Sequence, residues 1–229
     1  MEIDKPIILL AEDDENLAYV VRDYFNLMGY KTFLCSNGNV AWDTFCNEKI
    51  DLCLLDVMLP GMDGFSLGEK IRQRDQSVPI IYLTAKSMKE DKLQGFKIGA
   101  DDYVTKPFDI EELSMRIAVF IKRKDKTQQG FTQALLGNMV FDYSNLQLIS
   151  ESDTINLTQR EADVLNMLVQ NKNNVVKRDE LLLKIWGSDD YFLGRSLDVY
   201  ISKIRKFLKV NAAVNIQNVH SVGFKLRCD

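Results

Sequence analysis

The sequence is poor in the residues that build disulfide frameworks and zinc sites. Its 229 residues include four cysteines and a single histidine. The cysteines lack C-x-x-C spacing, and one histidine cannot complete a Cys/His zinc set. We therefore expect reduced thiols in a cytoplasmic protein and no structural zinc.

Long hydrophobic runs are also missing. The longest, such as residues 7–11, have the length of a strand and are far too short to span a bilayer. Acidic residues within the first fifteen positions predict that there is no signal peptide. A content of 46% hydrophobic and 27% charged residues is typical of soluble globular proteins. We expect neither export nor membrane association.

Charge is divided unevenly along the chain. Residues 1–123 hold 21 acidic and 15 basic residues, whereas residues 124–229 hold 12 acidic and 14 basic ones. Between positions 195 and 227 there are seven basic residues and one acidic residue, Asp198. This excess suggests a polyanion contact, although a solvated helix face would be the simpler explanation if charge were the only observation.

Short apolar runs alternate with helix-period segments in the first half of the chain. We expect strands at 7–11, 31–35, 52–56, 80–84 and 102–105, and helices near 15–28, 38–49, 64–74, 89–98 and 110–123. This pattern predicts an α/β doubly wound fold with a five-stranded parallel sheet and helices on both faces. In such sheets the functional residues lie beyond the carboxyl ends of the strands.

Charged and hydroxyl side chains occupy these strand ends. Glu12 and Asp13 follow the first strand, Asp56 the third, Thr84 the fourth and Lys106 the fifth. Several carboxylates held together need a cation, and hard oxygen ligands suit Mg²⁺. A lysine nearby suits a phosphate oxygen, so Asp56 is a candidate nucleophile toward phosphorus. Each residue alone is more commonly a turn or cap residue; the joint arrangement carries the inference.

The second half of the chain has a different pattern. Residues 124–134 are polar and contain glycine, which is typical of a linker. In residues 135–229 we expect strands at 138–143 and 146–149, helices near 158–171, 178–185 and 194–208, and a terminal hairpin of residues 216–219 and 224–227. Thr158 and Glu161 have the spacing of a capping box. Three helices followed by a hairpin describe a winged variant of the helix-turn-helix.

Residues 7–123 resemble a bacterial two-component receiver domain. The matching segments are ILLAEDD (8–14), LLDVMLPGMDG (54–64), YLTAK (82–86) and GADDYVTKPFDIEEL (99–113). The resemblance implies that Asp56 accepts a phosphoryl group and that Tyr103 is a switch residue. It also implies a cis bond before Pro107, phosphoryl contacts from Thr84 and Lys106, and Mg²⁺ held by Glu12, Asp13, Asp56 and the backbone carbonyl of Met58.

The same resemblance implies a symmetric homodimer on activation. Its interface would use the fourth helix, the fifth strand and the fifth helix of the receiver. The matching positions form an apolar patch of Leu93 and Phe96, ion pairs Lys92–Glu112 and Asp102–Arg116 across the two-fold axis, and a pair of Asp101 with Lys122 or Arg123.

Residues 135–228 resemble the winged-helix DNA-binding domain of OmpR/PhoB response regulators. The matching segments are LTQREADVLNMLVQN (157–171), VVKRDELLLKIWG (175–187), RSLDVYISKIRKFL (195–208) and VHSVGFKL (219–226). The positions imply a base contact from Lys203, and backbone or groove-wall contacts from Arg195, Ser196, Tyr200 and Arg205. His220 stands where the family usually has a minor-groove arginine, although a turn residue without contacts is an equal alternative. We expect Trp186 in the core and the loop after it as an RNA polymerase contact.

Together these features predict a phosphorylation-controlled regulator of transcription. A sensor histidine kinase would phosphorylate Asp56, the receivers would pair, and the winged helices would bind double-stranded promoter DNA. One alternative is a DNA-binding regulator that is independent of phosphorylation. Another is an aspartyl-phosphate phosphohydrolase, which Met58 disfavours because its side chain cannot transfer a proton. We therefore expect no enzymatic activity beyond slow self-dephosphorylation.

Overall fold

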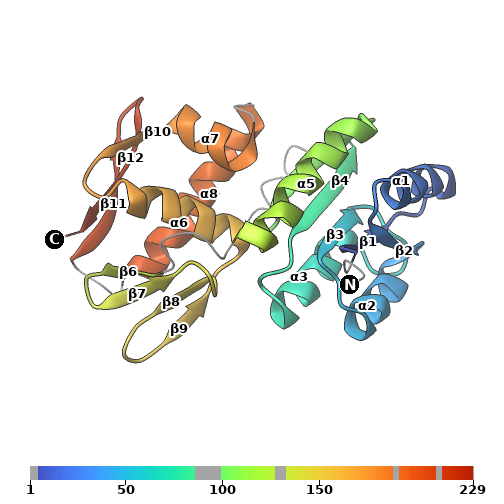
Figure 1. Ribbon diagram of the computed structural model, residues 1–229, viewed down its shortest axis with the longest axis horizontal. Helices are drawn as coiled ribbons and strands as arrows, with labels where there is room; N and C mark the ends of the chain where they lie inside the picture. Colours follow the sequence, from blue (N-terminus) through green and yellow to red (C-terminus); the bar gives the residue numbers. More distant parts are fainter. Residues whose placement is uncertain (1–4, 86–98, 127–132, 188–190, 210–212, 229) are drawn as a thin grey trace. The chain divides into compact units, whose positions relative to one another are not determined.

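The computed structural model describes residues 5–85, 99–126, 133–187, 191–209 and 213–228 (Figure 1). The chain divides into two compact units, residues 1–126 and 127–229. None of the helices in the described part is long and apolar enough to cross a membrane.

The first unit is built on a parallel sheet of five strands. They are β1 (Ile7–Ala11), β2 (Lys31–Cys35), β3 (Leu52–Asp56), β4 (Ile80–Ala85) and β5 (Asp102–Lys106), in the order β2-β1-β3-β4-β5. Every residue of β3 is buried, as expected for a strand covered on both faces. From β1 the chain continues to β2 at one edge of the sheet, and from β3 it continues to β4 and β5 toward the other edge. A functional site is therefore expected at the carboxyl ends of β1 and β3, where this direction changes.

Four described helices cover this sheet: α1 (Glu15–Leu27), α2 (Gly38–Asn47), α3 (Gly64–Arg74) and α5 (Ile110–Lys126). Asp14, Asn37 and Asp63 cap the first three by accepting backbone N–H hydrogen bonds. Phe25 of α1 and Leu113 and Ile117 of α5 pack with strand residues in one apolar core. The predicted helix 89–98 lies outside the described residues.

The described part of the second unit contains two small antiparallel sheets and three helices. The first sheet has strands β6 (Gln133–Leu136), β7 (Met139–Asp142), β8 (Gln147–Ile149) and β9 (Thr154–Asn156). Helices α6 (Gln159–Gln170), α7 (Arg178–Trp186) and α8 (Tyr191–Leu208) follow the sheet, and β10 (Val175–Lys177) separates the first two. Strand β12 (Gly223–Cys228) pairs with both β10 and β11 (Val214–Val219), which completes a winged helix.

Most predicted elements are confirmed within a few residues, and the boundary region is corrected. The predicted linker 124–134 is too long, because α5 continues through Lys126 and β6 begins at Gln133. Strands β6, β9 and β10 were not predicted. The capping box of Thr158 and Glu161 is confirmed at the start of α6. The Lys106-Pro107 bond is cis, as predicted.

Candidate functional site

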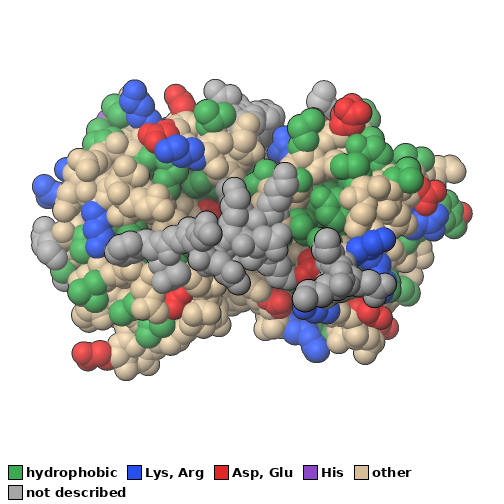
Figure 2. All heavy atoms as spheres, in the orientation of Figure 1, with side chains coloured by type: hydrophobic (Ala, Val, Ile, Leu, Met, Phe, Trp, Pro, Cys, Tyr) green, Lys and Arg blue, Asp and Glu red, His purple; other side chains and the backbone are tan. Residues whose placement is uncertain are grey.

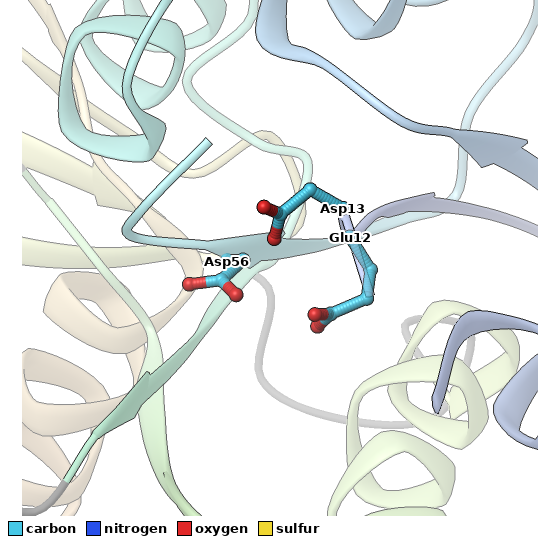
Figure 3. Close-up of side chains that lie close together, drawn as sticks. All are labelled: Glu12, Asp13 and Asp56. Carbon is cyan, nitrogen blue, oxygen red and sulfur yellow. The ribbon is translucent and has the colours of Figure 1, made fainter. Parts of the chain in front are cut away.

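Three carboxylates meet where β1 and β3 end. Glu12 and Asp13 directly follow β1, and Asp56 is the last residue of β3. The two strands are parallel neighbours, with Ala11 opposite Leu55, so their carboxyl ends lie at the same edge of the sheet. One oxygen of each carboxylate lies within 4.8 Å of the others. Figure 3 shows the three groups directed toward a common space.

Burial differs among the three carboxylates. Glu12 is 1% exposed and Asp56 is 7% exposed, whereas Asp13 is exposed. Oxygen Oδ1 of Asp56 accepts a hydrogen bond from the backbone N–H of Met58 at 2.9 Å. Asp56 is therefore oriented by its own loop through Oδ1, and its second oxygen, Oδ2, contacts Lys106.

Lys106 connects the two buried carboxylates. Its ammonium nitrogen lies 2.6 Å from Oε1 of Glu12 and 2.5 Å from Oδ2 of Asp56. Burial raises the pKa of Glu12 above its usual range, against the opposing effect of Lys106. Burial acts to lower the pKa of Lys106, but its hydrogen bonds to Asp56 and Glu12 outweigh this effect and raise the pKa. The lysine is thus a fixed positive charge beside Asp56.

The carboxylates also fit a divalent cation. Oxygen Oε2 of Glu12 is buried and has no hydrogen-bond partner among the described residues. A buried carboxylate oxygen left without a donor is unfavourable, and a metal ion would satisfy it. Three carboxylates present the hard oxygen ligands that Mg²⁺ prefers. The residues present therefore fit the magnesium site expected in a receiver.

The remaining predicted pocket residues lie on neighbouring strands. Thr84 is 2% exposed near the end of β4, and it pairs in register with Thr105, next to Lys106. Tyr103 of β5 is 8% exposed, so its ring occupies a buried position. The side chain of Met58 is 63% exposed at the mouth of the pocket.

Two glycines permit the close packing of the loop after Asp56. A Cβ atom on Gly64 would lie 2.0 Å from the carbonyl oxygen of Asp56, and one on Gly38 would lie 2.0 Å from that of Met62. Backbone contacts at this distance cannot be relieved by a side-chain rotation. The starts of α3 and α2 therefore fix the loop that carries Met58.

The predicted dimer contacts are corrected in part. Asp101 is fully buried and pairs at 2.5 Å with Arg72 of α3, and its pair with Lys122 or Arg123 stays a prediction. Asp102 is 1% exposed and pairs at 3.0 Å with Arg116 of its own chain, and Arg116 also binds Glu112 at 2.8 Å. Lys92, Leu93 and Phe96 and the side chains of Lys122 and Arg123 lie outside the part that the structure describes.

Helix α8 carries the predicted nucleic-acid contacts, and two of them are wrong. Ser196 and Tyr200 are fully buried together with Leu197, Ile201 and Ile204, so neither is available to a groove. The Tyr200 ring packs against Trp186, with ring centroids 5.7 Å apart. Trp186 is 5% exposed, as predicted for a core residue.

The basic residues of α8 have different environments. Lys203 lies 3.3 Å from Glu161 of the capping box, and Arg205 donates to Ile216 O and Asn218 Oδ1 of β11 at 2.9 and 2.7 Å. Both are partly exposed, whereas Lys206 is exposed. The side chain of Arg195 lies outside the described part. Lys203 and Arg205 thus join α8 to its neighbours as well as presenting charge.

The wing is a tight hairpin with an exposed tip. Val219 pairs with Gly223, which leaves His220, Ser221 and Val222 in the turn, and all three are exposed. A Cβ atom on Gly223 would lie 2.0 Å from the carbonyl oxygen of Val176, so the wing packs closely on β10. His220 is therefore exposed at the tip of a hairpin that is held against β10.

Three arginines organise these sites, and no sequence pattern indicated them. Arg72 binds Asp101 and the carbonyls of Val78 and Gly99. Arg160 is buried against Trp186 and donates to the carbonyl of Ile185. Arg178 binds Asp198 of α8 at 2.6 Å and lies over the ring of Phe224 in β12. Arg72 and Arg160 are buried and Arg178 is partly exposed, and in the sequence all three look like surface charges whose partners only the fold reveals.

Comparison with known proteins assigns a domain family to each half of the chain. Residues 8–118 match the response regulator receiver domain, and residues 152–226 match the C-terminal domain of transcriptional regulatory proteins. The transcriptional regulatory protein RprY of Bacteroides fragilis is 43% identical over 97% of this chain and 95% of its own. The chain belongs to the OmpR/PhoB family of response regulators.

Other relatives support this membership of the OmpR/PhoB family. Heme response regulator HssR of Staphylococcus epidermidis is 33% identical over 95% of this chain and 96% of its own. A RitR mutant structure matches 98% of this chain and 100% of its own, with a TM-score of 0.78 and 27% identity. The OmpR/PhoB homolog DrrB of Thermotoga maritima matches 97% and 99%, with a TM-score of 0.51 and 29% identity. The protein is a DNA-binding transcriptional regulator controlled by phosphorylation.

Proposed function

We propose that a sensor histidine kinase phosphorylates Asp56 and that the phosphoprotein binds promoter DNA as a homodimer. The observation that carries this proposal is the grouping of Glu12, Asp13 and Asp56 with Lys106 at one sheet edge. The same chain also carries a winged helix. A pocket that controls DNA binding is therefore a better explanation than a pocket without function in a protein that binds DNA constitutively.

Phosphoryl transfer needs little more from the protein than positioning and charge. A carboxylate oxygen of Asp56 would form a bond to phosphorus as the bond to the histidine nitrogen of the kinase breaks. Lys106 would exchange its hydrogen bond to Asp56 for one to a phosphoryl oxygen, and Thr84 would donate to another. Mg²⁺, held by Glu12, Asp13, Asp56 and the carbonyl of Met58, would offset the negative charge of the phosphoryl group.

Dimerisation would then follow from the position of Tyr103. Attraction of Thr84 toward the phosphoryl group would leave space into which the Tyr103 ring can turn and be buried. On α5, Met115 is 67% exposed and Val119 is 37% exposed, close in sequence to Glu112 and Arg116. Figure 2 shows hydrophobic side chains at the surface among acidic and basic ones, a mixture suited to a reversible interface.

On the DNA, α8 would enter the major groove and His220 would approach the minor groove. Lys203 remains the proposed base contact, because it is partly exposed and would need only to leave Glu161. Arg195 and Arg205 would contact the backbone or the groove wall. The loop after Trp186 is proposed to contact RNA polymerase.

Intact-protein mass spectrometry tests the phosphorylation step directly. With a small-molecule phosphodonor and Mg²⁺, the wild-type chain should gain the mass of one phosphoryl group, and Asp56→Ala should not. Asp43→Ala, which removes an exposed carboxylate of α2, is the matched control and should gain the same mass as the wild type. No gain in the wild type, or an equal gain in Asp56→Ala, would overturn the proposal.

A further inference from the structure

Tyr82 lies in the centre of β4 between the two proposed switch residues. It precedes Thr84 by two positions, so both side chains lie on the same face of the strand. On the neighbouring strand it pairs in register with Tyr103. The ring centroids of Tyr82 and Tyr103 are 5.2 Å apart, with an interplanar angle of 30°. The buried ring of Tyr103 therefore rests on the ring of Tyr82.

On its other side Tyr82 is held by α3. The Phe65 ring meets it edge-on, at a centroid distance of 5.1 Å and an angle of 64°. A Cβ atom on Gly68 would lie 1.9 Å from the Tyr82 hydroxyl oxygen and 3.0 Å from Cζ. The hydroxyl thus occupies the space that the absence of a side chain at Gly68 leaves open.

The hydroxyl of Tyr82 is unsatisfied in this arrangement. Tyr82 is 0% exposed, and its hydroxyl oxygen has no hydrogen-bond partner among the described residues. A buried hydroxyl without a partner is unfavourable by an amount equivalent to about fivefold or more in a two-state equilibrium. A phenylalanine would provide the same ring without this cost.

We propose that Tyr82 is a positioning residue for Tyr103: its ring supports the buried position of Tyr103, and its hydroxyl limits how much that position is populated before Asp56 is phosphorylated. When Tyr103 turns outward, the Tyr82 ring can move away from Gly68 into the space that Tyr103 leaves, where its hydroxyl can reach water. The unsatisfied group therefore destabilises only the buried position. The inference rests on the Tyr103 switch of the proposed function, which it extends to β4 and α3.

Fluorine NMR of the full chain with 3-fluorotyrosine at position 103 tests this proposal without any phosphodonor. We expect two environments in the wild type, and a shift toward the buried one of about fivefold or more in Tyr82→Phe. Tyr19→Phe, which removes the hydroxyl of a tyrosine 47% exposed on α1, is the matched control and should leave the ratio unchanged. An unchanged ratio in Tyr82→Phe, a shift outward, or a single identical signal in both proteins would overturn the proposal.

A second variant moves the equilibrium in the opposite direction. Gly68→Ala would place its methyl group against the Tyr82 hydroxyl, so the ring must move toward Tyr103 and the outward position should gain. Combining it with Tyr82→Phe removes the closest contact and should return the ratio toward that of the wild type. If the double variant kept the ratio of Gly68→Ala, the contact between the added methyl group and the Tyr82 hydroxyl would not be the cause of the change at Tyr103. Because no phosphoryl group is involved, these results are independent of the mass-spectrometric test of Asp56.

Discussion

Lys203 and Lys206 lie three residues apart on α8 and have different environments. Lys203 lies beside Glu161, whereas Lys206 projects into solvent. A lysine that faces solvent on a groove-binding helix is free to neutralise a phosphate without first losing an internal partner. Charge alone therefore does not tell which basic residues of α8 are available to DNA. The contacts that these residues make with α6 do.

Changing Lys206 to alanine should weaken DNA binding through the loss of one phosphate contact. The slope of log affinity against log salt concentration should decrease in magnitude by about 0.9. Fluorescence anisotropy titrations of promoter DNA at several salt concentrations measure this slope. Lys49→Ala, which removes an exposed lysine of the receiver, is the control and should leave it unchanged. An identical slope in Lys206→Ala and the wild type would exclude the contact.

At the scale of single residues, the pocket could be predicted and the groove contacts could not. The pocket residues are fixed by strand ends, and the sequence marks strand ends clearly. Ser196 and Tyr200 were assigned by position in a motif. The Tyr200 ring packs against Trp186 of α7, which in turn packs against Arg160 of α6. Such partners are distant in sequence and leave no local pattern.

Helix α3 begins directly after the loop that follows Asp56, and its first turn depends on one carboxylate. Oxygen Oδ1 of Asp63 accepts from the backbone N–H groups of Phe65 and Ser66, both at 3.0 Å, and Oδ2 accepts from the Ser66 hydroxyl at 2.6 Å. Partial burial acts to raise the pKa of Asp63, but these hydrogen bonds outweigh it and lower the pKa.

Asp63→Ala should lower the free energy of unfolding by about 1 kcal/mol at neutral pH. Because the folded-state pKa of Asp63 is lowered, its contribution is present above the unfolded pKa and is lost as the pH falls through the folded value. The difference between variant and wild type should therefore shrink below about pH 4. Urea unfolding at neutral pH and below about pH 4 measures this difference. Asp23→Ala, which removes an exposed carboxylate, is the control. A difference that stayed constant would mean that the cap does not act through its charge.

The start of β5 depends on a buried ion pair at the end of α3. Arg72 and Asp101 have side chains 8% and 1% exposed, and Asp101 also accepts from the backbone N–H of Ile80 at 2.8 Å. Arg72→Met would leave a buried carboxylate without its cation, which typically costs about 3–5 kcal/mol. Hydrogen exchange of the β4 and β5 amides in the full chain should accelerate accordingly. Arg22→Met, which breaks an exposed pair with Asp23, should change little.

Elements with strong periodicity were predicted well, and short elements were not. Helix α3 was predicted with its observed bounds, because Asp63 marks its start and apolar spacing marks its length. Strand β10 has only three residues, and its identity as a strand comes from pairing with β12. Strands β6 and β9 likewise depend on partners elsewhere in the sheet.

For the whole molecule, the division of charge matches the division of function. The acidic first unit holds the pocket of carboxylates and Lys106, and the basic helix and hairpin lie in the second. The order of domains and the family could be predicted from motifs, because each motif lies at a strand end or on a helix of defined spacing. We expect coupling between the units in the phosphorylated chain, and no local pattern encodes it.

The most direct test of that coupling is DNA affinity with and without phosphorylation. Anisotropy titrations of promoter DNA should be made with wild type and Asp56→Ala, each with and without a small phosphodonor and Mg²⁺. We predict that donor and metal tighten binding by the wild-type protein by about tenfold or more and leave Asp56→Ala unchanged. Equal affinities for the wild type under both conditions, or equal tightening in Asp56→Ala, would contradict control of DNA binding by this carboxylate.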